Sequence, residues 1–200
     1  MENVIRSAFQ GKRVLVTGHT GFKGSWLSIW LHAMGAKVIG VALDPATDRD
    51  NFVLSGIGQK IEADIRADIR DRQRMLDIFR QYQPEVVFHL AAQPLVRLSY
   101  DIPVETYETN VMGSIHIMEA IRHTDSVRAA VMITTDKCYE NREQIWGYRE
   151  NEPMGGYDPS LPRKVLPRSP SAPGVAASSI LLITARSTTS PSPVFVPAMW

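Results

Sequence analysis

The stretch VLVTGHTGFKG, residues 14–24, carries most of the information about the fold. Three apolar residues open it, two of them β-branched, and three glycines follow at the spacing G-x-x-G-x-x-G. Beyond the last glycine, apolar residues recur at helical spacing, namely Leu27, Trp30, Leu31 and Met34. The stretch therefore predicts a strand, a glycine turn and the start of a helix.

A turn of this kind suits a dinucleotide. Without Cβ atoms at Gly18, Gly21 and Gly24, the backbone can approach a pyrophosphate, whose charge meets free N–H groups at the helix N-terminus. The spacing is one residue longer than G-x-G-x-x-G, but Asp44 follows Gly24 by twenty residues, at the end of a second predicted strand. An aspartate there can bind an adenosine ribose and repel a 2′-phosphate, which favours NAD over NADP. The alternative is a tight turn without a ligand, with Asp44 capping a loop.

Composition narrows the class of protein. The 200 residues are 44% apolar and 22% charged, with a formal net charge of +1, as in ordinary soluble domains. We expect a small-molecule ligand and no nucleic acid, because a nucleic acid would require a concentrated basic surface. No apolar stretch is long enough for a membrane span. Cys138 is the single cysteine, and the five histidines form no close pair. We therefore expect a cytoplasmic protein without a metal.

Up to residue 159 the chain alternates between short apolar runs and helical patterns, which is typical of βαβ units. Strands are expected within residues 14–16, 37–42, 58–67, 86–90 and 129–133, and further helices over 71–82 and 104–121. Asp71 is the expected cap of the first of these helices. Right-handed crossovers then predict a Rossmann-like, doubly wound α/β fold with a parallel sheet in the order 3-2-1-4-5.

Residues 160–200 differ in composition from the rest of the chain. They contain no Asp or Glu but seven of the thirteen prolines. Proline removes a helical hydrogen bond and clashes with the preceding turn, so no long helix is expected, and at most one strand, over residues 180–184. We predict an incomplete dinucleotide-binding domain over 1–159 and an aberrant, poorly ordered tail over 160–200.

Further candidate residues stand where the other strands should end. Asp68 and Ile69 follow the third strand and can contact an adenine from two sides, although a solvated acidic loop explains these residues equally well. Small residues after the fourth strand, in the run Leu90-Ala91-Ala92, leave room for a cofactor. Thr134-Thr135-Asp136-Lys137 follows the fifth and combines a hydroxyl with an acid and an amine. The alternative for that cluster is a strand cap with a surface ion pair.

Taken together, four motifs resemble the extended short-chain dehydrogenase/reductase family of nucleotide-sugar enzymes. They are residues 17–24, His89-Leu90-Ala91-Ala92-Gln93, Thr109-Asn110-Val111 and residues 134–137. Within that family, the runs GHTGFKGSW (18–26), AAQPLVR (91–97), DKCY (136–139) and WGYRENEP (146–153) resemble the CDP-glucose 4,6-dehydratases. The resemblance covers roughly residues 10–159.

The resemblance implies a dehydration with an internal redox cycle on CDP-glucose. NAD takes a hydride from C4 of the sugar, water is lost across C5–C6, and the hydride returns to C6. On this mapping Thr135 assists the oxidation, Asp136 protonates the departing hydroxyl and Lys137 is the base at C5, where related dehydratases usually carry Glu. The implied NAD contacts are Gly18, His19, Gly21, Phe22, Lys23, Gly24, Asp44, Asp68, Ile69, Leu90, Ala91, Ala92 and Thr109. A homodimer is implied as well.

One required residue is missing from the pattern. The family needs a Tyr-x-x-x-Lys pair, and here Ser160 stands at the tyrosine position while Lys164 keeps the lysine spacing. Tyr157 has the wrong spacing to replace it. Because composition changes at the same place, we interpret the tail as a frameshift product and the chain as truncated and inactive, with its dimer interface lost. Alternatives are another extended short-chain enzyme, such as a sugar-nucleotide epimerase, or a dinucleotide-binding module without catalysis.

Overall fold

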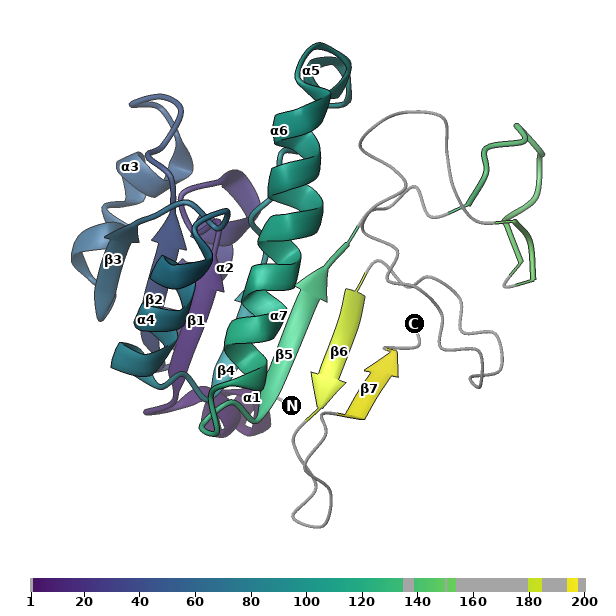
Figure 1. The fold of residues 1–200 in the computed structure, drawn as a ribbon. Helices are drawn as coiled ribbons and strands as arrows, with labels where there is room; N and C mark the ends of the chain where they lie inside the picture. Colours follow the sequence, from purple (N-terminus) through teal and green to yellow (C-terminus); the bar gives the residue numbers. More distant parts are fainter. Residues whose placement is uncertain (1, 135–138, 150, 154–179, 185–193, 198–200) are drawn as a thin grey trace.

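The computed structural model describes residues 2–134, 139–149, 151–153, 180–184 and 194–197. These residues form one sheet of seven strands in the order β3-β2-β1-β4-β5-β6-β7 (Figure 1). The strands are β1 (Arg13–Thr17), β2 (Lys37–Ala42), β3 (Ala63–Arg66), β4 (Val86–His89), β5 (Ala129–Ile133), β6 (Ile180–Thr184) and β7 (Val194–Pro197). The first five are parallel, which confirms the predicted order 3-2-1-4-5.

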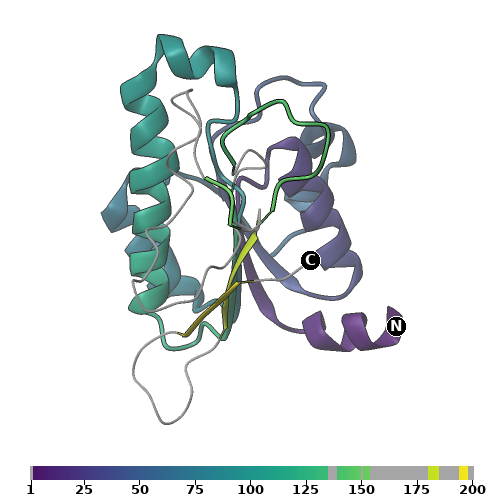
Figure 2. The same ribbon diagram turned by 90° about the vertical axis from the view of Figure 1, so that its right-hand side faces the viewer.

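Helices cover both faces of this sheet, as Figure 2 shows with the sheet seen nearly edge-on. On one side lie α1 (Glu2–Phe9), α2 (Phe22–Ala33) and α3 (Asn51–Ser55), and on the other α4 (Arg72–Tyr82), α6 (Pro103–Tyr107) and α7 (Ser114–Arg122). Two short helices complete the set, η1 (Ile57–Gln59) and α5 (Val96–Asp101). The chain therefore winds in both directions from the centre of the sheet, as a doubly wound fold requires.

Each face of the sheet has its own hydrophobic core, because successive strand residues point to opposite sides. Val14 and Val16 of β1 pack toward α2, with Leu31 of that helix and Met34 directly after it. Leu15 points the other way, into a larger cluster with α4 and α7. All of these side chains in β1 are fully buried. The short apolar run before the glycine turn, residues 14–16, therefore lies at the centre of both cores.

The helix after β3 begins as the sequence predicts. The carboxylate of Asp71 accepts a hydrogen bond from the backbone N–H of Arg74 at 2.9 Å, which caps α4. Met75, Leu76, Ile78 and Phe79 of this helix are buried. The expected single helix over 104–121 is instead α6 and α7 joined by a π-helical segment, η2 (Glu108–Gly113). Such segments arise where a helix accommodates an extra residue.

The expectation of at most one strand in the tail is wrong. The strand expected at 180–184 is present as β6, and β7 pairs with it as a second. Both pairings, β5 with β6 and β6 with β7, are antiparallel. Pairing with β6 gives residues 194–197 a partner that local composition cannot reveal, and Pro197 belongs to an edge strand of the sheet, where proline is tolerated. The boundary at residue 159 stays a prediction.

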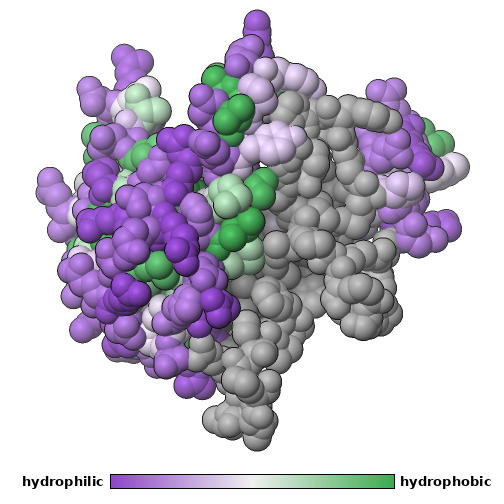
Figure 3. Space-filling view, viewed as in Figure 1, coloured by the Kyte–Doolittle hydropathy of each residue, from purple (hydrophilic) through white to green (hydrophobic). Residues whose placement is uncertain are grey.

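Hydrophobic residues also gather on the outer surface along the helix that runs from α6 to α7 (Figure 3). Val104, Met112 and Ile115 are 65%, 45% and 42% exposed there. Among the described residues, no helix has the length and apolar character needed to cross a membrane.

Candidate functional site

The glycine turn lies between β1 and α2, at the point where the strand order reverses from β1 to β4. Gly18 has a φ of +74°, in the left-handed region, and a Cβ there would lie 2.8 Å from the backbone nitrogen of Ala91. A Cβ on Gly24 would overlap the carbonyl group of Gly18. Gly21 precedes α2, and no side chain in the described part of the chain caps that helix. Its first N–H groups are therefore available to an anion.

His19 ties the turn to the two neighbouring strands. Its side chain is fully buried, lies directly over Gly40 of β2 and meets the ring of Phe52 edge-on at 5.2 Å between centroids. Nε2 lies 2.7 Å from Oδ1 of Asp64 and 3.4 Å from Nη1 of Arg66. Burial lowers the pKa of His19, although the Asp64 carboxylate acts in the opposite direction. The two residues that begin α2, Phe22 and Lys23, are by contrast exposed.

Asp44 lies at the same edge of the sheet, two residues beyond β2. Its side chain is 85% exposed, and Oδ1 lies 3.0 Å from Nε of Arg66. The preceding Leu43 carbonyl accepts a hydrogen bond of 3.0 Å from the Thr20 hydroxyl, which holds this strand end against the glycine turn. Sequence reasoning missed Arg66. Alternation along β3 places Asp64 and Arg66 on one face of the strand, and that spacing was the signal available.

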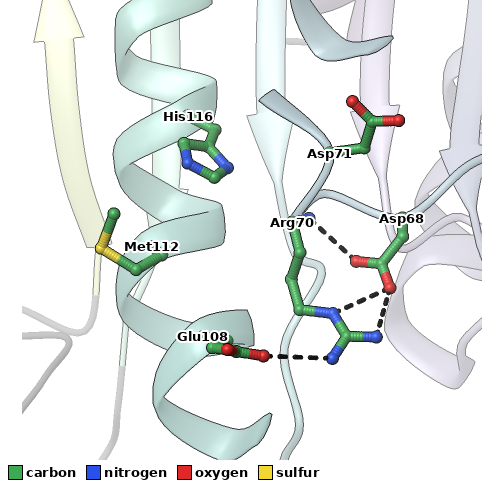
Figure 4. A pocket seen from close by; sticks show the side chains of 6 residues that line it. All are labelled: Asp68, Arg70, Asp71, Glu108, Met112 and His116. Carbon is green, nitrogen blue, oxygen red and sulfur yellow. Dashed lines mark hydrogen bonds and ion pairs between the residues drawn. The ribbon is translucent and has the colours of Figure 1, made fainter. Parts of the chain in front are cut away.

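Asp68 and Ile69 are adjacent in the chain but lie in different surroundings. Asp68 lines an open depression of about 510 Å³ together with Arg70, Asp71, Glu108, Met112 and His116 (Figure 4). Arg70 bonds to Asp68 at 2.6 Å, which lowers the pKa of that carboxyl group, and lies 3.5 Å from Glu108. Ile69 is 4% exposed and packs in the core against Gly113. Only the carboxylate borders open space.

A buried chain of hydrogen bonds joins the ends of β1 and β4, and sequence reasoning missed it. The Thr17 hydroxyl oxygen accepts from the backbone N–H groups of Leu90 at 3.1 Å and Ala91 at 3.2 Å. Its proton is then donated to Nδ1 of His89, 2.7 Å away, and Nε2 of His89 donates to the hydroxyl of Ser114 at 3.0 Å. We assign His89 as the neutral Nε2–H form on this pattern. The network fixes the backbone of the predicted cofactor loop.

The continuation of that loop is fixed by the π-helical segment. Asn110 is 2% exposed, and its side-chain oxygen accepts from the backbone N–H of Gln93 at 2.8 Å while its amide donates to the Gln93 carbonyl at 3.1 Å. Ala92 directly precedes Gln93, and Thr109 directly precedes Asn110. Both of these predicted contact residues are half-buried.

The predicted catalytic residues lie outside the described residues. They are Thr135, Asp136, Lys137 and Lys164, together with Ser160 at the tyrosine position. Thr134 is described and follows the end of β5, so the chain enters this segment at the same edge as the glycine turn.

The five parallel strands thus bring most of the predicted cofactor residues to one edge. Gly18, Asp44, Asp68 and Leu90 all follow the carboxyl end of a strand, where open α/β sheets bind ligands. Within the described residues, no group of three His, Cys, Asp or Glu side chains is placed to hold a metal ion.

Known proteins share much of the sequence of this chain. A CDP-glucose 4,6-dehydratase from Salmonella typhimurium is 56% identical over 154 residues, which are 77% of this chain and 43% of that protein. A CDP-paratose 2-epimerase from Salmonella typhi is 32% identical over 74% of this chain and 46% of its own length. The chain therefore spans less than half the length of these relatives.

Solved structures also resemble this chain over about three quarters of its length. A UDP-glucose 4-epimerase from Stenotrophomonas maltophila, determined with bound NAD, superposes with a TM-score of 0.61 at 28% identity, over 74% of this chain and 44% of that one. The model of the GDP-mannose 4,6 dehydratase family matches residues 15–162, which include the last three residues of β1, the glycine turn and the other four parallel strands. The chain accordingly belongs to the GDP-mannose 4,6 dehydratase family of enzymes.

Proposed function

We propose that this chain is the dinucleotide-binding part of an NAD-dependent nucleotide-sugar 4,6-dehydratase that acts on CDP-glucose. The observation that carries the proposal is the glycine turn. It places the N-terminus of α2, which no described side chain caps, next to the end of β2 just before Asp44, where the strand order of the sheet reverses. The 56% identity to a CDP-glucose 4,6-dehydratase supports the choice of substrate. The bound NAD of a similar epimerase structure supports the choice of cofactor.

The described residues fit NAD. Close packing of Gly18 and Gly24 lets the backbone approach a pyrophosphate, and the N–H groups of α2 supply donors for its oxygens. The exposed carboxylate of Asp44 can accept hydrogen bonds from ribose hydroxyls, and that of Asp68 can accept one from an adenine amine. Ala91 and Ala92 have short, half-buried side chains just after the end of β4. NAD, when bound, supplies a hydride acceptor that later returns the hydride.

The roles proposed for the catalytic residues come from the family resemblance. Thr135 donates a hydrogen bond to the sugar oxygen during oxidation, Asp136 gives a proton to the departing C6 hydroxyl, and Lys137 removes the proton from C5. An amine can act as a base only in its neutral form, so Lys137 must lose its proton before this step. An acid and a base at adjacent positions suit an elimination, which an epimerase does not need.

Ser160 favours a second candidate function, dinucleotide binding without turnover. A serine hydroxyl is far less acidic than a tyrosine phenol, so it cannot take the proton from the C4 hydroxyl at neutral pH. We therefore propose that the chain binds NAD but turns over CDP-glucose poorly.

The experiment combines calorimetry with product analysis. The full chain is titrated with NAD, then incubated with NAD and CDP-glucose, and the 4-keto-6-deoxy product is measured. We expect NAD binding with little product from the unaltered chain. More product from Ser160→Tyr than from the control Ser160→Ala would show that this position limits turnover. A folded sample that binds no NAD would overturn the dinucleotide proposal, and rapid turnover by the unaltered chain would overturn the binding-only proposal.

Three further proposals follow from the sequence pattern. The tail over 160–200 is proposed to be a frameshift product, and sequencing the encoding DNA contradicts this if no other frame restores a tyrosine at position 160. A cytoplasmic location is proposed from the biosynthetic family. For the homodimer that the family resemblance implies, the exposed side chains on α6, η2 and α7 offer one apolar surface, and sedimentation velocity measures the oligomeric state.

A further inference from the structure

Arg66, the last residue of β3, is anchored on several sides. Its guanidinium group forms a fork with Asp64, with Nη1 at 2.7 Å from Oδ1 and Nη2 at 3.0 Å from Oδ2. It also lies over the ring of Phe52, 5.1 Å from the centroid, and its Nη1 lies 3.4 Å from Nε2 of the buried His19. These contacts hold the guanidinium group in place without help from Asp44.

Asp44 is the loosely held partner of this pair. It contacts the remaining edge of the guanidinium group, with Oδ1 3.0 Å from Nε, and its side chain is 85% exposed, compared with 34% for Arg66. An exposed ion pair of this kind contributes little to stability. Removal of the Asp44 charge therefore leaves Arg66 anchored, with one edge open to solvent.

We propose that Arg66 is a latent binding group for a ribose 2′-phosphate, and that Asp44 masks it. The inference rests on the proposed function, because Asp44 is the residue assigned there to the adenosine ribose. Asp44 acts in two ways. Its charge repels a 2′-phosphate, and it occupies the Nε edge that would otherwise donate to the phosphate oxygens. The preference for NAD over NADP then depends on one carboxylate, that of Asp44, which covers the anchored guanidinium group of Arg66.

The test measures binding of two small probes to the full chain by calorimetry. One is adenosine 2′,5′-bisphosphate and the other is 5′-AMP, which lacks the 2′-phosphate. In Asp44→Asn we expect the ratio of the two affinities to shift toward the bisphosphate by about tenfold or more, as one charge-assisted hydrogen bond allows. The double variant Asp44→Asn, Arg66→Gln should lose this gain.

A matched control separates Arg66 from general positive charge. Arg49 belongs to the same connection after β2, and Asp44→Asn, Arg49→Gln should keep the full gain. Loss of the gain in that variant but not with Arg66→Gln would overturn the proposal, as would no gain in Asp44→Asn. Thermal unfolding checks each protein, and Arg66→Lys, which keeps the charge but not the fork, replaces Arg66→Gln if the latter does not fold.

Failure of the proposed function gives a different result. If the unaltered chain binds neither NAD nor 5′-AMP, the NAD proposal is wrong. The masking of Arg66 is judged separately, by whether Asp44→Asn gains binding of the bisphosphate that Arg66→Gln then removes.

Discussion

At the scale of single residues, Gly18 and Gly56 share a left-handed backbone but differ in their surroundings. Gly18 has a φ of +74° and its missing Cβ would press on the backbone of Ala91, whereas Gly56 has a φ of +60° with nothing within 4 Å. Gly18→Ala adds a backbone clash to the conformational cost, so we expect it to lower the free energy of unfolding by about 3 kcal/mol or more. Urea unfolding measures the loss.

Gly56→Ala is the matched control. It meets only the cost of a left-handed alanine, about 1–2 kcal/mol. Equal losses in the two variants would show that the turn does not press against the loop after β4.

His19 makes stability depend on pH. Burial lowers its pKa in the folded protein below the ordinary value of 6.5, so the unfolded chain binds the proton more readily. The stability from neutral His19 is thus fully present above the unfolded pKa and is lost as pH falls below it toward the folded pKa. We expect thermal unfolding midpoints to fall between about pH 7.5 and pH 5.5, and to fall less in His19→Asn.

The control for this prediction is His32→Asn. His32 is exposed on α2, so its removal should leave the pH dependence as it is in the unaltered chain. An equal flattening in both variants would contradict the role assigned to His19.

Among single residues, the site residues that could be predicted are those that belong to a local sequence pattern. The glycines of the turn and Asp44 were predicted because a strand, a turn and a helix frame them within thirty-one residues, 14–44. Thr17 and Arg66 were not found. Their partners are distant in sequence, Ala91 and His19 respectively, and only the pairing of strands brings them together.

At the scale of elements, the π-helical segment η2 and the loop after β4 depend on each other through Asn110. The Asn110 side chain contacts that loop through two hydrogen bonds to the backbone of Gln93. Asn110→Ala removes both, and we expect a loss of about 1–3 kcal/mol in the free energy of unfolding. Faster hydrogen exchange at the Gln93 amide is the more specific readout.

Asn51→Ala provides the comparison for that variant. Asn51 makes one side-chain hydrogen bond, to the hydroxyl of Ser25 at 2.8 Å, and lies away from the loop. Asn51→Ala should lower the free energy of unfolding by less than Asn110→Ala does, and it should leave hydrogen exchange at the Gln93 amide unchanged. Unaltered exchange in Asn110→Ala would refute the dependence.

Elements with a strong period were predicted well. Residues 37–42 were expected as a strand and form β2 with the same limits, and Asp71 was expected as the cap of α4. The short helices α1, α3 and α5 were not predicted, since five to eight residues hold too little periodicity. The π-helical segment has no sequence signal either, because it differs from an α-helix only in its hydrogen-bond pattern.

At the scale of the whole molecule, the domain boundary predicted at residue 159 can be tested by shortening the chain. A chain of residues 1–159 keeps every residue of the two core clusters, from Ile5 to Met132. We expect it to retain the circular dichroism of an α/β fold. It also loses β6, which leaves β5 as an unpaired edge, so we expect more self-association in sedimentation velocity.

A chain of residues 1–184, which retains β6, is the control for self-association. If residues 1–159 are unfolded while the longer chain is folded, the predicted boundary is wrong.

The contact between Gly18 and Ala91 has a consequence for the entropy of binding. The turn after β1 and the loop after β4 touch where no methyl group fits, so neither can shift without displacing the other. A ligand that spans both loops meets them already ordered with respect to each other. Ordering loops on binding costs conformational entropy, and here most of that entropy is lost already during folding. The affinity for a long ligand therefore depends less on closure of the site.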